Sequence, residues 1–174
     1  MNARLATTTL IAASVALAAC SKKAPEELPP APVNTDDAGT NTGTLPQDGI
    51  GAPGSQSHFE SNVGQMNTVV YFDTDQYNID AEDTAKLQRQ AQYFQQYGNV
   101  TFTVEGHADE RGTREYNLAL GERRANAAKN YLVSLGIPES RIRTISYGKE
   151  RPVALGSDEG SWAQNRRAAT VTIN

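Results

Sequence analysis

Proline is distributed so unevenly along this chain of 174 residues that it limits where a fold can form. Six of the eight prolines lie between residues 21 and 60, together with five glycines and many Thr, Asn, Gln and Asp residues. This stretch lacks hydrophobic periodicity, so it cannot bury enough apolar surface to offset the entropy lost on ordering. We therefore expect a flexible, disordered linker over residues 20–61 and one folded domain over residues 62–174.

The segment that precedes the linker, residues 1–19, is typical of an export signal. Arg4 supplies a positive charge, and the apolar run that follows is too short to span a bilayer core of about 30 Å at about 1.5 Å per residue. The run ends in Leu17-Ala18-Ala19-Cys20 and so resembles the bacterial lipobox. The alternative is an ordinary signal peptide followed by a chance cysteine.

The lipobox resemblance has consequences for the membrane. It implies that the signal is cut before Cys20, the only cysteine of the chain, and that N-acyl and S-diacylglycerol lipid is attached there. Several acyl chains are needed for a durable anchor. Ser21, where Asp would favour the inner membrane, implies an anchor in the outer membrane, with the protein on its periplasmic face.

Charge argues against nucleic acid as a partner. The whole chain carries a net charge of −4, and residues 62–174 hold 13 basic residues against 14 acidic ones. A nucleic-acid-binding domain normally has a basic surface. Binding by this domain should therefore depend on local charge placement.

Apolar periodicity within the domain alternates between the strand type and the helix type. Strands are expected at residues 68–72, 100–105, 141–147 and 168–173, with helices between Asp80 and Gly98 and over residues 115–135. This order predicts an α+β fold, a two-layer α/β sandwich. We expect a mixed four-stranded sheet with the two main helices on one face.

The second helix distinguishes between two adjacent arginines. Its buried stripe is expected to consist of small and aliphatic residues: Gly121, Ala125, Ala128, Leu132 and Leu135. At 100° per residue, Arg124 lies about 60° from the centre of this stripe and Arg123 about 160° from it. We therefore expect Arg124 at the edge of the core and Arg123 in solvent.

Asp109 follows the second strand at the sheet edge where open α/β sheets often bind ligands. Arginine is the natural bidentate partner of a carboxylate. Asp109 and Arg124 could therefore hold a small zwitterion, with backbone amides of the 73–76 turn completing the site. The alternative is a structural ion pair between them.

Catalysis and metal binding find little support in the residues. Glu105, His107 and Asp109 alternate and could imitate a metal site, but the other histidine, His58, falls in the expected linker. The chain has no Gly-x-Ser-x-Gly nucleophile motif. We interpret His107 as a hydrogen-bonded structural histidine and expect no enzyme, no metal and no cofactor apart from the lipid.

Motifs spread across the domain resemble the OmpA-like peptidoglycan-binding domains, in particular those of peptidoglycan-associated lipoproteins. They are Val70-Tyr71-Phe72-Asp73, Val104-Glu105-Gly106-His107-Ala108-Asp109-Glu110-Arg111-Gly112-Thr113, Tyr116-Asn117, Leu120-Gly121-Glu122-Arg123-Arg124-Ala125-Asn126-Ala127, Ser146-Tyr147-Gly148-Lys149-Glu150 and Asn165-Arg166-Arg167-Ala168. The resemblance covers nearly the whole domain. It implies noncovalent binding to the diaminopimelate of the peptidoglycan peptide.

The resemblance also implies roles for particular residues. Asp109 would hold the side-chain amine of diaminopimelate and Arg124 its carboxylate. The remaining pocket residues implied are Asp75, Leu120 and Asn117, with Arg166 as a structural or pocket-edge arginine. Thr74 departs from the family, which often has an aromatic residue there, and this removes an apolar contact.

Partners follow from the same resemblance. It implies membership of the Tol–Pal system, which serves membrane integrity and envelope constriction at division, and contact with the periplasmic protein TolB. The alternatives are an OmpA-type peptidoglycan-binding lipoprotein without Tol partners and a periplasmic wall hydrolase that uses Glu105, His107 and Asp109.

Overall fold

The structure is a computed structural model that describes residues 51–173. The predicted signal, Cys20 and most of the predicted linker lie outside these residues. The elements are α1 (Gln56–Val63), β1 (Val69–Tyr71), α2 (Ala81–Gln96), β2 (Thr101–His107), α3 (Arg114–Ser134), β3 (Ile142–Gly148), α4 (Glu159–Asn165) and β4 (Arg167–Ile173), with short 3-10 helices at Gln65–Thr68 and Glu139–Arg141.

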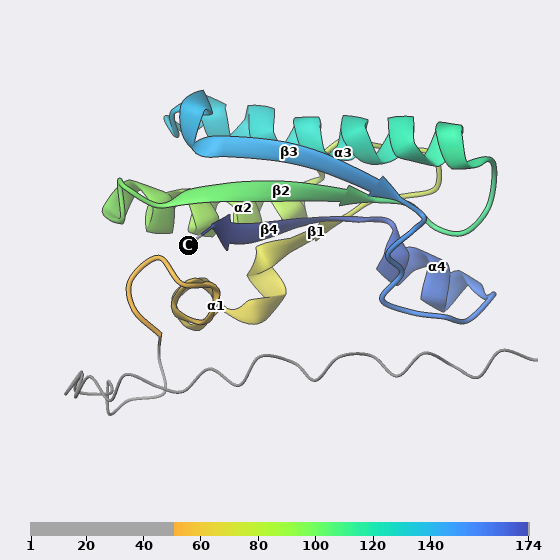
Figure 1. Ribbon diagram of the computed structural model, residues 1–174, viewed down its shortest axis with the longest axis horizontal. Helices are drawn as coiled ribbons and strands as arrows, with labels where there is room; N and C mark the ends of the chain where they lie inside the picture. Colours follow the sequence, from red (N-terminus) through yellow and green to blue (C-terminus); the bar gives the residue numbers. More distant parts are fainter. Residues whose placement is uncertain (1–50, 174) are drawn as a thin grey trace, which may run out of the picture. The chain divides into compact units, whose positions relative to one another are not determined.

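The four strands form one mixed sheet in the order β1-β4-β2-β3. β4 is antiparallel to both β1 and β2, whereas β2 and β3 are parallel. In Figure 1 the strands lie in front of α2 and α3, which cover the same face of the sheet. The predicted two-layer α+β fold is confirmed. β1, β2 and β3 all run in one direction, so their carboxyl ends meet at a single edge.

The helices begin where the sequence supplies a cap. Asp80 accepts a hydrogen bond from the amide of Asp83 at the start of α2, and Thr113 accepts one from the amide of Tyr116 at the start of α3. These side chains satisfy amides that a helix leaves free in its first turn. The residues just after the end of α3 include Gly136, whose φ of 93° suits glycine.

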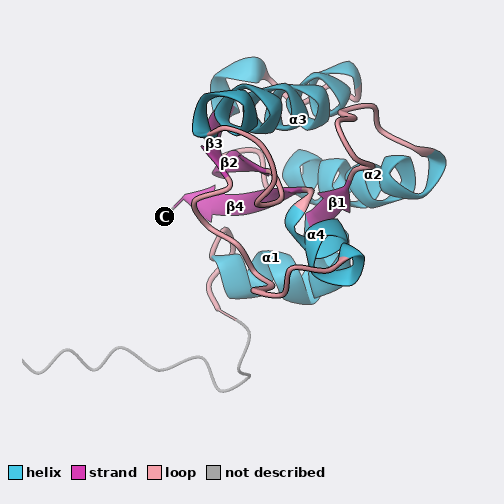
Figure 2. Cartoon of the chain, turned by 90° about the vertical axis from the view of Figure 1, so that its right-hand side faces the viewer, coloured by secondary structure: helices cyan, strands magenta, loops and turns pink. Residues whose placement is uncertain are grey.

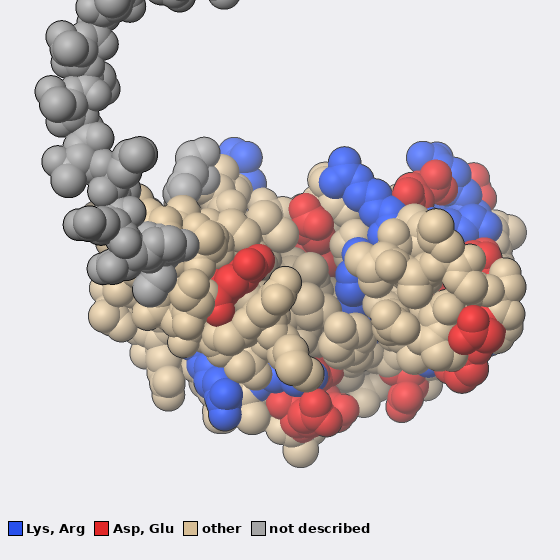
Figure 3. Space-filling view, turned by 90° about the horizontal axis from the view of Figure 1, so that it is seen from below, with Lys and Arg blue, Asp and Glu red and all other residues tan. Residues whose placement is uncertain are grey.

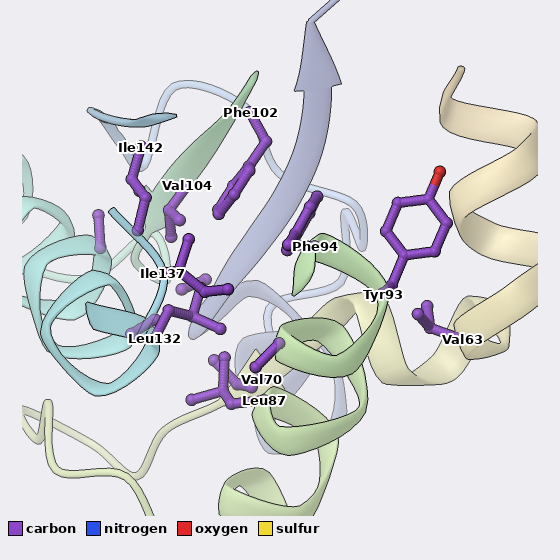
Figure 4. Packing of buried hydrophobic residues seen from close by; sticks show 14 of the residues in the cluster. Val63, Val70, Leu87, Tyr93, Phe94, Phe102, Val104, Leu132, Ile137 and Ile142 are labelled. Atoms are coloured by element: carbon purple, nitrogen blue, oxygen red, sulfur yellow. The ribbon is translucent and has the colours of Figure 1, made fainter. Parts of the chain in front are cut away.

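The core lies between the sheet and its helices. Phe94 of α2 stacks on Phe102 of β2 with ring centroids 3.7 Å apart, and Figure 4 shows the two rings facing one another. Leu87 and Leu132 are fully buried beside them. At about 1.5–3 kcal/mol for each fully buried large side chain, this cluster supplies the main force that holds α2 and α3 on the sheet.

The amino-terminal boundary of the domain was predicted wrongly. Helix α1 falls within the expected linker, yet Phe59 is fully buried and stacks on Phe94 at 5.0 Å. His58 contacts the Tyr93 hydroxyl at 2.9 Å, and the side chain of Gln56 accepts a hydrogen bond from the amide of Thr172. These residues belong to the fold because Phe59 completes the core beside Phe94 of α2; in Figure 2, α1 lies below β4, away from α3.

Helix α3 approaches β2 closely because two glycines face each other. A methyl group on Gly106 would overlap the carbonyl oxygen of Gly121, and one on Gly121 would lie 2.9 Å from the carbonyl oxygen of Gly106. Gly121 lies just under one helical turn before Arg124. The close contact therefore sets the position of the Arg124 side chain at the end of β2.

No helix within residues 51–173 combines the length and the apolar character needed to cross a membrane.

Candidate ligand-binding site

A pocket of about 310 Å³ opens at the edge where the parallel strands end. Its walls come from the turn after β1, the loop after β2 and the first turns of α3. We call it the Asp109 pocket. Its lining residues are Thr74, Asp75, Ala108, Asp109, Arg111, Gly112, Tyr116, Asn117 and Leu120. Four of the five residues predicted for the site, all but Arg124, therefore line one pocket.

Asp109 is the buried anion of this pocket, with 7% of its surface exposed. Both carboxylate oxygens accept hydrogen bonds from the Arg111 guanidinium, at 3.0 Å from Nε and 2.7 Å from Nη2. The backbone amide of Arg111 donates a third, also 3.0 Å long. Burial favours the neutral acid, but these bonds outweigh it, so the pKa of Asp109 lies below its ordinary value.

Arg124 lies beneath the pocket with no exposed surface. Its guanidinium donates to the carbonyl oxygens of Gln76 at 2.9 Å, His107 at 2.8 Å and Asp73 at 3.0 Å. It thus fastens the 73–76 turn to the end of β2. Burial, and then the nearby Arg166 cation, lower the pKa of Arg124 to about 10, so it stays charged at neutral pH.

The choice between the two neighbouring arginines is confirmed. Arg124 is among the largest fully buried side chains, while Arg123 is exposed, with its guanidinium carbon 5.9 Å from the centre of the Tyr77 ring. The helical stripe predicted this difference. What Arg124 binds in this structure is backbone carbonyl oxygen of its own chain.

The remaining predicted residues build the pocket walls. Asp75 has a φ of 56°, an uncommon value outside glycine, and accepts a hydrogen bond from the Tyr116 hydroxyl at 3.0 Å. The side chain of Asn117 is buried and donates to the carbonyl oxygen of Arg111 at 2.7 Å. Leu120 is buried and gives the pocket an apolar floor.

Arg166 connects the pocket to α4. It is 5% exposed, donates to the Phe72 carbonyl oxygen at 3.0 Å and pairs with Glu159 at 2.6 Å. Its Nη1 lies 3.5 Å from an Asp109 oxygen. The predicted structural role at the pocket edge fits these contacts.

His107 is buried, as expected of a structural histidine, but the predicted hydrogen bond is wrong. Neither ring nitrogen has a hydrogen-bond partner among the described residues. Burial, and then the cations of Arg167 and Arg151, lower the pKa of His107 to about 3. The ring is therefore neutral at pH 7.

Glu105, His107 and Asp109 do not converge on one centre. A register shift occurs between Gly106 and His107, where β2 pairs with β3. His107 Nε2 lies 3.7 Å from Glu105, whereas Asp109 binds Arg111. Among residues 51–173, no three His, Cys, Asp or Glu side chains are grouped so that they could hold a metal ion.

Sequence reasoning missed Arg111 and Trp162 as parts of the site. The guanidinium carbon of Arg111 lies 4.2 Å from the centre of the Trp162 ring, and Trp162 donates to Glu110 at 3.0 Å. The spacing Asp109-x-Arg111 is a local signal that could have indicated the ion pair. Trp162 lies more than fifty positions away on α4, a helix that was not predicted.

Charge of both signs is interspersed on one face of the domain. Figure 3 shows acidic and basic side chains scattered among uncharged ones on this face, without a large region of a single sign. A ligand would therefore be recognised by the individual charges of a pocket, as the near balance of acidic and basic residues predicts.

Comparisons with known proteins agree with this fold and these motifs. The OmpA family model matches residues 71–166, more than half of the chain. The chain belongs to the OmpA family, as the resemblance of its motifs indicated.

Among its relatives, a peptidoglycan-associated lipoprotein of Rhizobium meliloti is 52% identical over 158 residues, which cover 91% of this chain and 82% of the relative. A peptidoglycan-associated lipoprotein of Agrobacterium fabrum is 58% identical over 123 residues, or 71% of this chain and 68% of the relative. The crystal structure of the peptidoglycan-associated lipoprotein from Burkholderia pseudomallei has a TM-score of 0.60 at 48% identity and covers 61% of this chain and 90% of that one.

Proposed function

We propose that this chain binds noncovalently to the diaminopimelate-containing peptide of peptidoglycan, with the Asp109 pocket as its binding site. The observation that carries the proposal is a buried, ionised carboxylate in a pocket that also holds Asp75, Asn117 and Leu120. An ammonium group is the natural partner of such a carboxylate. The names of the relatives, peptidoglycan-associated lipoproteins, agree with this ligand.

The two charges of diaminopimelate have different access to the protein. Its side-chain amine can enter the pocket, which both Asp109 and Asp75 line. Arg124, the proposed partner of the carboxylate, is covered by the 73–76 turn, whose carbonyl oxygens it binds. A guanidinium has five N–H donors, and three of them are used here. Two donors remain, but the side chain has no exposed surface, so direct contact with a ligand carboxylate requires this turn to move.

Sedimentation with purified sacculi that contain diaminopimelate tests the proposal. We expect Asp109→Ala and Arg124→Ala to abolish cosedimentation while circular dichroism still shows a folded protein. Arg123→Ala is the matched control, since it removes an exposed arginine at the adjacent position. If both site variants still sediment with sacculi as the wild type does, the assignment of the site is wrong.

The proposed function is noncatalytic. Glu105, His107 and Asp109 do not form one constellation, and a neutral, buried His107 is poorly placed to transfer protons. The competing class is a wall hydrolase. Release of soluble muropeptides from sacculi by the purified wild-type protein, and not by Asp109→Ala, would favour the hydrolase instead.

Anchorage in the outer membrane is the second part of the proposal. Lipid on Cys20 would hold the chain at the periplasmic face of the outer membrane, while the domain holds the cell wall. Cys20→Ser is expected to move the protein from the outer-membrane fraction into the soluble periplasmic fraction. If this variant stays in the membrane fraction after sacculi are digested, the lipid anchor is not what retains it.

We further propose that the protein acts in the Tol–Pal system through TolB. The support is the family resemblance, and the runner-up is an OmpA-type lipoprotein without Tol partners. A pull-down with the TolB of the same organism separates the two. Capture of TolB supports the Tol–Pal assignment, and no capture at micromolar concentrations favours the runner-up.

A further inference from the structure

The cation-binding position at Asp109 is already filled by a side chain of the same loop. Arg111 engages both carboxylate oxygens in the bidentate geometry that arginine favours. A ligand ammonium that pairs with Asp109 needs these same two oxygens. Arg166 Nη1 already lies 3.5 Å from one of them, which leaves little further room for a cation. Ligand and Arg111 therefore compete for one carboxylate.

The backbone around Arg111 is fixed, so only its side chain can yield. Its amide donates to Asp109, and its carbonyl oxygen accepts from the Asn117 side chain at 2.7 Å. Lys149 donates to the carbonyl oxygens of Glu110 and Gly112, at 3.1 and 2.7 Å. The loop after β2 is thus pinned on both sides of Arg111.

The guanidinium of Arg111 differs from the two other arginines of the site in being accessible. Its side chain is 40% exposed, whereas that of Arg166 is 6% exposed and Arg124 is fully buried. Separating an ion pair that is in partial contact with water costs less free energy than separating a buried pair. Arg111 can therefore leave Asp109 without leaving a buried cation unpaired.

Trp162 and Glu159 of α4 offer the Arg111 guanidinium contacts that do not depend on Asp109. Arg111 already covers the face of Trp162, which is partly exposed on α4. The carboxylate of Glu159 is on the same helix; one of its oxygens pairs with Arg166 at 2.6 Å, and its side chain is 65% exposed. The pKa of Arg111 is raised by its hydrogen bond to Asp109 first, and also by the charges of Glu159 and Asp75. It therefore remains a cation in either position.

We propose that Arg111 is an internal counter-ion of the pocket, which the ammonium group of the ligand must displace from Asp109 toward Trp162 and Glu159. The proposal rests on the proposed function, since it concerns the same pocket. It assigns Arg111 a part in setting affinity: the observed dissociation constant includes the cost of separating the Arg111–Asp109 pair. It also explains how a buried carboxylate stays ionised while the pocket is free.

The test measures binding of a soluble stem peptide, L-Ala-γ-D-Glu-meso-diaminopimelate, to the full-length protein in detergent by calorimetry. Arg111→Met keeps an unbranched apolar stem that reaches about as far as Nε of the arginine, but it has no guanidinium and cannot pair with Asp109. We expect it to bind the peptide about 3- to 30-fold more tightly than the wild type, the range that a partly exposed bidentate pair supports.

Two further variants control for charge and for folding. Arg114→Met removes an equal charge from the start of α3, where the exposed Arg114 pairs with Glu150, and should bind within about twofold of the wild type. Arg111→Lys keeps the charge but loses the planar guanidinium that pairs with both carboxylate oxygens. The affinity of this variant for the peptide should therefore lie between those of the wild type and Arg111→Met. Weaker or unchanged binding by both Arg111 variants overturns the proposal.

Trp162 provides a second readout, since it is the only tryptophan of the chain. Saturating peptide should change its fluorescence in the wild type, because Arg111 moves on the ring, and should change it far less in Arg111→Met. An equal change in both proteins contradicts displacement. If peptide binding requires Asp109 but is not tightened in Arg111→Met, only the role of Arg111 is refuted. If binding is insensitive to Asp109→Asn, the proposed function fails as well.

Discussion

His107 makes the stability of this domain depend on pH in a way that one substitution isolates. Its pKa is 6.5 in a model peptide and about 3 in the folded protein, so the unfolded chain binds a proton that the folded chain excludes between these values. Stability therefore rises with pH across this window and is lost as pH falls. Each pH unit well inside the window changes the free energy of unfolding by about 1.4 kcal/mol.

The groups that face His107 decide the sign. Arg167 of β4 and Arg151 oppose a charge on the ring, and Tyr147 of β3 lies beside it with ring centroids 5.6 Å apart. The Glu105 carboxylate lies 3.7 Å from Nε2, which is too distant for a hydrogen bond. Burial and two cations therefore outweigh one carboxylate, and the neutral ring is favoured.

The test compares urea unfolding of the wild type and His107→Leu at pH 7 and pH 5. Relative to the variant, the wild type is expected to lose about 2 kcal/mol over this interval, a large share of a typical stability of roughly 5–15 kcal/mol. At pH 7 the variant should lie within about 1 kcal/mol of the wild type, because leucine is similar in volume and both ring nitrogens lack partners. Parallel curves for the two proteins from pH 7 to pH 5 would refute the reasoning, since carboxylates elsewhere titrate equally in both.

Three further outcomes follow from named contacts. Gly106→Ala should destabilise the fold by about 3 kcal/mol or more in urea unfolding, because its methyl group overlaps the Gly121 carbonyl; a loss under about 1 kcal/mol means that α3 can move away. Gln90→Leu should cost about 2–4 kcal/mol, since the buried Gln90 bonds the Thr170 hydroxyl at 2.7 Å and a backbone carbonyl, and adding Thr170→Val should recover part of that loss. Binding to sacculi should not decline between pH 7 and pH 5 through Asp109, whose lowered pKa keeps it ionised there, and a midpoint near pH 6 would mean that another group controls binding.

Periodicity was enough for the elements that bury a continuous stripe, and it failed for those that do not. The bounds of α3 were predicted within one residue because small and aliphatic positions recur along 21 residues. Helix α1 presents only Phe59 and Val63 to the core, in a polar stretch that follows a proline-rich one. Helix α4 has seven residues and one buried position, so no stripe exists to be detected.

The residues that line the pocket were predictable, whereas the contacts of the arginines around it were not. Asp75, Asn117 and Leu120 line one pocket with Asp109, as the resemblance to OmpA-like domains implied. The partners of Arg124 are carbonyl oxygens. Every residue carries such an oxygen, so the sequence cannot show which three will surround a guanidinium. The same limit hid the fact that Arg124 closes the 73–76 turn.

The three arginines around Asp109 differ in burial and, with it, in what they bind. Arg124 and Arg166 are buried and bind backbone carbonyl oxygens, so they hold the loops, while the accessible Arg111 neutralises the carboxylate. Arg166 lowers the pKa of Arg124 and Asp109 raises it. Removing the Asp109 charge therefore leaves two buried cations that repel each other with less compensation. Loss of binding in an Asp109 variant has to be separated from this loss of stability, and Asp109→Asn serves better than Asp109→Ala because it keeps the hydrogen-bond acceptor that orders the loop.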